Sequence, residues 1–437
     1  MIYDRQGNTM TGATPKAADL FGEALHAFNI YRGDPVAPLD EAIADAPAFA
    51  MAHILKAYLY GLATEPEAAA EARAIACAAR DLPMNAREQS HMAALKHMLT
   101  GNWTDAATCL DRHSADYPHD LVALQCGHLM DFYRANARNL RDRIARTLPR
   151  WAAGMEGHSI VLGMYAFGLE EAGDYARAEE MGRAATEEQP LDCWAHHAVA
   201  HVLEMQGRAK DGIAWMDSRE PHWSGDGNFF QVHNWWHKAL CHLELGQIDE
   251  VFRLYDEPIR GERSQVALDM LDASALLWRL SLAGHDIGGR WVELADAWDQ
   301  HADGRLYPFN DWHAAMAWLG AGQEHKVDAL TESYRRDTAA APETTVWARQ
   351  TGLPLIEGFR AFWSGDFQTA VEKLHPARYI ANSFGGSHAQ RDVIDWTLTE
   401  AALRGGMHGV GEALARERLA LKPHSPVNQA FLRRAAA

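Results

Sequence analysis

The sequence predicts an all-α protein built as a solenoid of helix-turn-helix units, and three observations lead to this prediction. Apolar residues recur three to four positions apart, as at Leu20, Phe21, Ala24 and Phe28 within Ala17–Ile30. No stretch alternates apolar and polar residues in the manner of a half-buried strand. A short glycine-containing motif, the recurrent phrase described below, recurs between the helical stretches. At 437 residues the chain also exceeds the usual size of one hydrophobic core, which favours a stack of small units.

The order of elements follows from the same periodicity. Residues 1–16 show no helical period, so we expect an irregular lead-in before a single α-solenoid over residues 17–437. No linker rich in Gly, Ser and Pro separates independent domains. The first predicted helices are Ala17–Ile30, Ala48–Tyr60 and Glu65–Arg80.

The recurrent phrase consists of a glycine, one or two polar residues and an apolar residue, followed by a helix rich in alanine. Its instances begin at Gly101, Gly173, Gly207, Gly246, Gly322, Gly365 and Gly406. Glycine suits this position because it adopts the left-handed backbone that ends a helix. The interval of 34 residues from Gly173 to Gly207 resembles the tetratricopeptide repeat, a helical hairpin of about 34 residues. Looser intervals elsewhere predict inserts at Ser218–Asn228 and Arg335–Thr344.

Two longer segments narrow this resemblance. They are DCWAHHAVAHVLEMQGR (residues 192–208) and VHNWWHKALCHLELG (residues 232–246). Both are similar to signature segments of the tetratricopeptide repeat protein 38 family, and shorter matches at 254–256, 276–280, 311–313 and 386–392 extend the resemblance over nearly the whole chain. The resemblance implies a cytoplasmic helical repeat protein. It implies the fold rather than a reaction.

Histidines gather on the predicted first helices of two successive repeats. In stacked hairpins the first helix of each repeat lines the concave side. His197, His201 and Glu204 lie ten, six and three residues before Gly207, and at about 100° per residue they share a narrow arc. We therefore expect them to face the groove.

Later repeats carry ionisable residues at similar heights. Counted back from the turn glycine of each repeat, His233 and His237 lie at thirteen and nine, and His313 also lies at nine. Asp392 lies thirteen before Gly405. The candidate catalytic residues are His197, His201, Glu204, His233 and His237.

One interpretation of the histidine pairs is a metal site. Two histidines at i and i+4 could bind one divalent metal, so His197 and His201 could form a shell that His233 or His237 completes. No glutamate follows the first histidine, which excludes the zinc-protease motif. The alternative is that these imidazoles are polar groups bonded to neighbouring carboxylates or to water.

A second interpretation is acid–base chemistry without a cofactor. His197 or His201 would act as the base and Glu204 would orient it, while His388 with Asp392 could do the same from a later repeat. The alternative for His388 and Asp392 is a surface pair on one helix face.

A third interpretation is a Cys–His dyad. Cys193 follows the plausible N-cap Asp192 and lies four residues before His197, and both the helix N-terminus and the imidazole would favour the thiolate. The alternative is a buried, inert thiol.

Aromatic and polar residues on the same helices are candidate ligand contacts. Tryptophans could stack on a flat or cationic ligand, or pack in the core. Arg391 could hold a carboxylate, or pair with Asp395 four residues on. The candidate ligand-binding residues are Trp194, Asn234, Trp235, His313, His388, Arg391 and Asp392.

Composition restricts the partners. A net charge of −18 disfavours nucleic acid and anionic membrane surfaces. Five separated cysteines, no leader pattern and no apolar run near ~20 residues favour the cytoplasm. We expect a small-molecule ligand that is bound in a His- and Trp-lined pocket and transformed by hydrolysis or elimination. The alternative is a scaffold whose groove binds a peptide or partner protein, and a homodimer is the default assembly.

Overall fold

The computed structural model describes residues 1–225, 227–336 and 341–436, and it is an assembly of antiparallel helical hairpins. The chain divides into two compact units. The first unit comprises Met1–Val199 and Arg219–Gln231, and the second comprises Ala200–Ser218 and Val232–Ala437. The divisions fall inside helices α11 (Cys193–Met205) and α12 (Ala209–Trp223) and after Gln231, the first residue of α13 (Gln231–Glu244).

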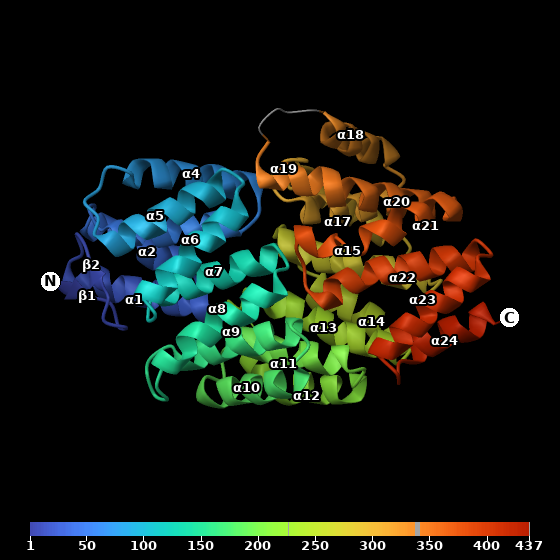
Figure 1. Cartoon of the computed structure of the whole chain (residues 1–437), viewed down its shortest axis with the longest axis horizontal. Coiled ribbons are helices and arrows are strands. Elements are labelled where there is room, and N and C mark those ends of the chain that lie inside the picture. The colour runs from blue at the N-terminus through green and yellow to red at the C-terminus, as the bar shows by residue number, and fades with distance from the viewer. Residues whose placement is uncertain (226, 337–340, 437) are drawn as a thin grey trace. The chain divides into compact units, whose positions relative to one another are not determined.

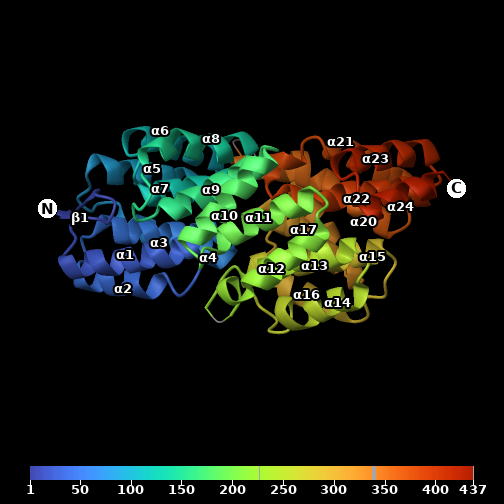
Figure 2. The same ribbon diagram turned by 90° about the horizontal axis from the view of Figure 1, so that it is seen from below.

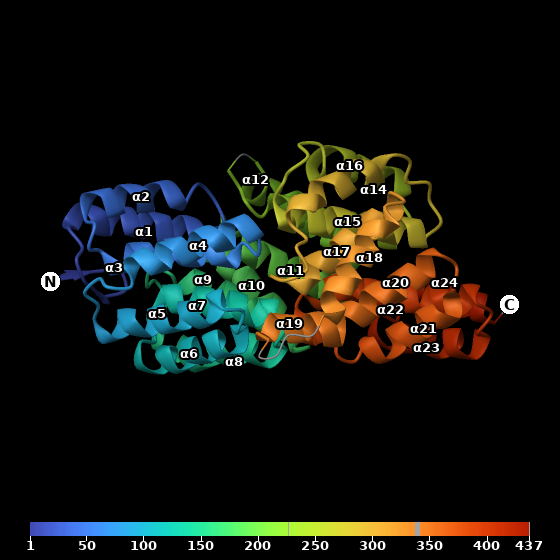
Figure 3. The ribbon, with the colours of Figure 1, turned by 90° about the horizontal axis from the view of Figure 1, so that it is seen from above.

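The helices of the first unit pack as successive pairs. Helix α1 packs on α2, α3 on α4, α5 on α6 and α9 on α10, and Figure 3 shows α5 to α8 side by side. The elements before α11 are β1 (Ile2–Tyr3), β2 (Thr9–Met10), α1 (Pro15–Ile30), α2 (Val36–Asp45), α3 (Ala50–Leu62), α4 (Pro66–Ala79), α5 (Ala86–Leu99), α6 (Trp103–Asp116), α7 (Leu121–Tyr133), α8 (Ala137–Thr147), η1 (Leu148–Arg150), α9 (His158–Glu171) and α10 (Tyr175–Glu188).

The second unit continues the same arrangement. Its hairpins include α20 with α21 and α22 with α23, followed by α24, and both Figure 1 and Figure 2 show these last helices together. The elements after α12 are α13 (Gln231–Glu244), α14 (Ile248–Leu254), η2 (Tyr255–Ile259), α15 (Ala267–Leu282), α16 (Arg290–Ala297), η3 (Trp298–Gln300), α17 (Pro308–Gly320), α18 (Glu324–Arg335), α19 (Glu343–Trp347), η4 (Ala348–Gly352), α20 (Leu353–Trp363), α21 (Phe367–Ala377), η5 (Ala381–Phe384), α22 (His388–Arg404), α23 (His408–Leu421) and α24 (Pro426–Ala435).

The expected fold class, an all-α solenoid of tetratricopeptide-like helical hairpins, is confirmed in each unit. Every glycine that begins the recurrent phrase has a positive φ, between 69° and 82°. Gly284 (φ 87°) ends α15 in the same way, and the sequence analysis missed it. Close packing of neighbouring helices depends on small residues. At Gly168 of α9, for example, an added Cβ would lie 2.4 Å from the carbonyl oxygen of Leu140 in α8.

Two local expectations need correction. The lead-in contains a small antiparallel hairpin, in which Ile2 pairs with Met10. It forms because the Asp4 carboxylate accepts hydrogen bonds from backbone N–H groups within the turn, including that of Asn8 at 2.7 Å. The insert expected at Ser218–Asn228 is helical as far as Trp223, whose fully buried side chain anchors the last turn.

The other expected insert, Arg335–Thr344, lies between the end of α18 and the start of α19, and residues 337–340 of it fall outside the described residues. In the described part of the chain, no helix combines the length and the apolar character that crossing a membrane requires.

Candidate functional site

Three imidazoles meet in the interior of the second unit and form what we call the histidine centre: His201, His233 and His237. His201 lies near the end of α11, and the other two lie one turn apart on α13. Each is at most 3% exposed. The ring centroid of His237 lies 4.3 Å from that of His201 and 4.7 Å from that of His233. One ring nitrogen from each residue lies within 4.8 Å of the other two.

Two carboxylates orient this centre from outside. Nδ1 of His233 lies 2.7 Å from Oδ2 of Asp272, on α15, and Nδ1 of His237 lies 3.1 Å from Oε2 of Glu204, on α11. An ionised carboxylate can only accept, so each Nδ1 donates its hydrogen. The two Nε2 atoms then point at each other across 3.2 Å.

Burial controls the charge of the centre. It lowers the pKa of His201 and of His237 well below the ordinary value, and the neighbouring imidazoles lower both further. Burial also raises the pKa of Asp272, although His233 opposes this. Nearby, the buried Arg279 guanidinium lies 5.5 Å from the centroid of the Trp236 ring. The lowered pKa values keep His201 and His237 neutral at pH 7, so a ring nitrogen of each can act as an acceptor or ligand.

Two of the predicted site residues, Trp194 and His197, belong to the first unit. Trp194 stacks on Tyr31 with ring centroids 5.6 Å apart, and His197 stacks on Phe167 at 5.3 Å. Phe230 contacts both rings. These residues form an aromatic layer, in which the tryptophan has the packing role that the sequence left open.

The thiol of Cys193 is not activated. Burial raises its pKa to about 12, and Nδ2 of Asn228 lies 2.8 Å from its sulfur. The expected thiolate beside His197 therefore does not form near pH 7. Burial outweighs the effect of the helix N-terminus.

The candidate ligand-binding residues on α13 and α17 are surrounded by other parts of the protein. Nδ1 of His313 donates to the carbonyl oxygen of Phe309 at 2.8 Å, and burial lowers its pKa to about 3. It is a packed core histidine. Asn234 is fully buried. The ammonium of Lys238 lies 4.7 Å from the ring centroid of the half-buried Trp235.

On α22 the structure shows partners that the sequence analysis did not name. Both oxygens of Asp392 accept from Arg418, at 2.9 and 3.1 Å. Arg391 donates to the carbonyl oxygens of Gly385 and Gly386 in the loop before α22, and Asp395 pairs with Arg378. The register of Asp392 also changes by one residue, because the left-handed glycine that ends α22 is the one at 406.

The sequence analysis missed a second buried cluster, in the first unit, which we call the Asp120 cluster: Arg87, His91, His113 and Asp120. Oδ2 of Asp120 accepts from Arg87 at 2.6 Å, from His91 at 2.9 Å and from His113 at 3.0 Å. Oδ1 caps α7 at the N–H of Ala123. Burial alone would raise the pKa of Asp120, but Arg87 and the imidazoles hold it well below the ordinary value. Only the N-cap position of Asp120 was readable in the sequence.

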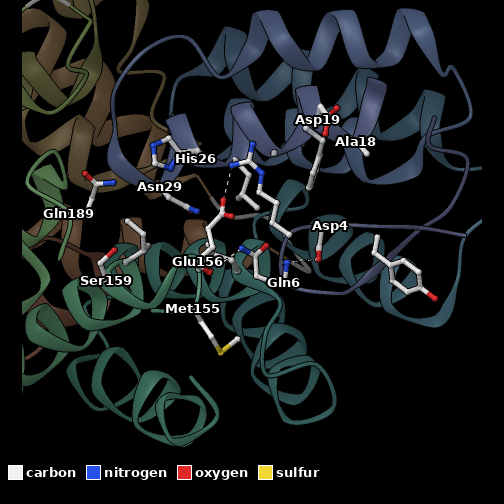
Figure 4. A pocket seen from close by; sticks show the side chains of 18 of the residues that line it. Asp4, Gln6, Ala18, Asp19, His26, Asn29, Met155, Glu156, Ser159 and Gln189 are labelled. Atoms are coloured by element: carbon white, nitrogen blue, oxygen red, sulfur yellow. Dashed lines mark hydrogen bonds and ion pairs between the residues drawn. The ribbon is translucent and has the colours of Figure 1, made fainter. Parts of the chain in front are cut away.

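Each unit also has a cavity. The first, of about 750 Å³, lies between the N-terminal hairpin, α1 and residues 154–160, and the Arg5–Glu156 ion pair (2.7 Å) lies among its lining side chains (Figure 4). The second, of about 510 Å³, is lined by aromatic residues such as Trp278 and Trp363 with Arg404. The histidine centre lines neither of these two cavities, and its three side chains are buried.

Comparison with known proteins gives likenesses to large helical chains. No family model matches the sequence. The fold is similar to a chain of the APC/C hetero-tetramer Cut9–Hcn1 (12% identity, TM-score 0.46, 96% of this chain and 76% of that one). It is also similar to human IFIT1, determined as a dimer with PPP-AAAA (13% identity, TM-score 0.42, 89% and 90%). The fold assignment rests on the hairpins described above, not on these likenesses.

Proposed function

We propose that this chain is a helical repeat protein of the tetratricopeptide repeat protein 38 kind, whose second unit binds a small molecule and transforms it by imidazole acid–base chemistry. Hydrolysis and elimination are the simplest reactions of this class. One observation carries the proposal: two imidazole–carboxylate pairs, His233 with Asp272 and His237 with Glu204, aim their Nε2 atoms at one point.

The chemistry follows from that geometry. A carboxylate that accepts from Nδ1 fixes the tautomer and the orientation of the ring, and it stabilises the imidazolium that forms when Nε2 takes a proton. Burial lowers the pKa of His237, so the ring is neutral at pH 7 and its Nε2, opposite the carboxylate, carries no proton. A substrate would reach Nε2 only if the surrounding side chains moved, since the rings are almost fully buried.

The same burial supports a second candidate function, a scaffold that binds a peptide or partner protein. Stacked helical hairpins present extended surfaces suited to such partners. In this case the histidine centre would be a structural element of the second unit.

Substitution of His233 tests the first proposal. The wild-type protein would be assayed on a panel of activated esters and acyl amides, and His233→Gln would be compared with His408→Gln, which changes an exposed histidine at the start of α23. We expect the His233 variant to lose about 10²- to 10⁴-fold in rate with its circular dichroism unchanged. A folded His233→Gln protein with the wild-type rate on an identified substrate would refute acid–base catalysis.

A further inference from the structure

We propose that His201, His233 and His237 bind one divalent transition metal, with zinc the best match, and that Asp272 and Glu204 orient two of these ligands from outside. The inference concerns the residues of the proposed function, but it stands on geometry alone and does not require turnover. Neutral imidazole nitrogens are preferred zinc ligands.

The separation of the two Nε2 atoms is the first step of the argument. With both Nδ1 hydrogens donated to carboxylates, two lone pairs face each other at 3.2 Å and repel, unless a cation or a proton lies between them. Zinc–nitrogen bonds of about 2.0–2.1 Å in a tetrahedral site place neighbouring ligand nitrogens about 3.3–3.4 Å apart. The observed separation is close to that value.

The position of the carboxylates is the second step. Metal-binding histidines almost always donate their second ring N–H to a carboxylate, a carbonyl or water, which fixes the ring and raises its basicity as a ligand. Asp272 and Glu204 occupy these outer positions. They would also balance the charge of a dication in an interior where Asp272 is fully buried.

The Asp120 cluster shows the opposite arrangement. There the carboxylate lies at the middle, and it accepts from both imidazoles and from the Arg87 guanidinium. The guanidinium supplies the positive charge that a metal would bring. Two clusters with the same residue types therefore have different roles, and only the centre in the second unit directs its imidazole nitrogens at one another.

A third imidazole of the second unit lies within reach of the same ion. His201 supplies the third nitrogen, and its ring centroid is 4.3 Å from that of His237.

The test measures metal binding by the full-length protein. Protein dialysed against a chelator would be titrated with Zn²⁺ by calorimetry and with Co²⁺ by visible spectroscopy. We expect one ion per chain, a Co²⁺ spectrum of the tetrahedral type, and loss of both in His237→Gln. Asp272→Asn should weaken binding by about 10- to 100-fold as a positioning residue. The exposed control His408→Gln should bind like the wild type.

The outcomes separate the two proposals. No saturable binding of Zn²⁺ or Co²⁺ by folded wild-type protein overturns the metal site, and leaves a shared proton between His233 and His237 as the explanation. If His237→Gln does not fold, X-ray absorption of the Co²⁺-loaded wild type decides, and fewer than three nitrogen ligands overturns the inference. Stoichiometric metal without turnover supports this site and counts against the proposed catalysis. Turnover that continues after a chelator has removed the metal supports the proposed catalysis and counts against this metal site.

Discussion

Replacement of Asp120 by asparagine should destabilise the first unit strongly. The two side chains have nearly the same shape, so the change removes charge with little change in packing. In the wild type one carboxylate oxygen accepts from Arg87, His91 and His113, and all four side chains are at most 3% exposed. The asparagine variant leaves the Arg87 guanidinium buried without its 2.6 Å partner, and the Asp4 carboxylate lies farther away, at 3.8 Å.

The magnitude follows from the cost of an uncompensated buried charge. Removing one partner of a buried ion pair typically costs about 3–5 kcal/mol. The single asparagine oxygen can keep either the bonds to His91 and His113 or the bond to Ala123, and we do not add separate terms for the bonds that are lost. For a unit of this size about 1 kcal/mol corresponds to roughly 2–4 °C, so the melting temperature of the unit should fall by about 10 °C.

Thermal unfolding and hydrogen exchange would measure the effect. The backbone amides of α5 to α7 should lose protection first, because Asp120 joins these helices. The control is Asp40→Asn, which breaks an ion pair with Lys56 in which Asp40 is 55% exposed, and should cost at most about 1 kcal/mol. If Asp120→Asn costs no more than Asp40→Asn, the cluster does not hold the helices together and the reasoning is refuted.

Two further predictions concern the second unit and helix packing. Burial would raise the pKa of Asp392, but Arg418 holds it at about 2, below the unfolded value of about 3.9. The pair therefore stabilises the fold above pH ~4, and this contribution is lost as the pH falls through 2. Asp392→Asn should therefore cost about 2 kcal/mol at pH 6 and flatten the acid side of the stability curve in urea denaturation, and an unchanged curve would contradict this. Gly168→Ala would push a Cβ against the backbone of Leu140 and cost about 1–3 kcal/mol, whereas Gly409→Ala in α23 meets no atom within 4 Å and should stabilise by about 0.5–1 kcal/mol. Equal melting temperatures for the two alanine variants would contradict the packing argument.

The helices and their turns were predictable because their signals are local. A glycine such as Gly207 terminates a helix through its own φ, and the apolar period of Ala17–Ile30 reports the face that the helix buries. The pairing of His233 with His237 on one helix face was readable for the same reason, since four residues make one turn. The lead-in hairpin was missed because its strands are only two residues long.

The partners of the candidate site were not predictable. Asp272 lies 39 residues from His233, and no local pattern marks it as the acceptor. The pairing of Asp392 with Arg418 was equally hidden, although Asp392 itself was a candidate. The bonds from Arg391 to the carbonyl oxygens of Gly385 and Gly386 were also not predictable, because they depend on the path of the loop before α22.

By itself the sequence determined the all-α hairpin fold, the glycines that end several helices, and that His233 and His237 share one helix face. Only the tertiary structure decided which nitrogen of each imidazole donates, which carboxylate accepts, and that His313 packs in the core. The physical reason is the separation in sequence over which each kind of interaction acts. Helix formation depends on hydrogen bonds and side chains within about four residues, whereas the charge and hydrogen bonding of a buried side chain depend on whatever distant helices bring against it.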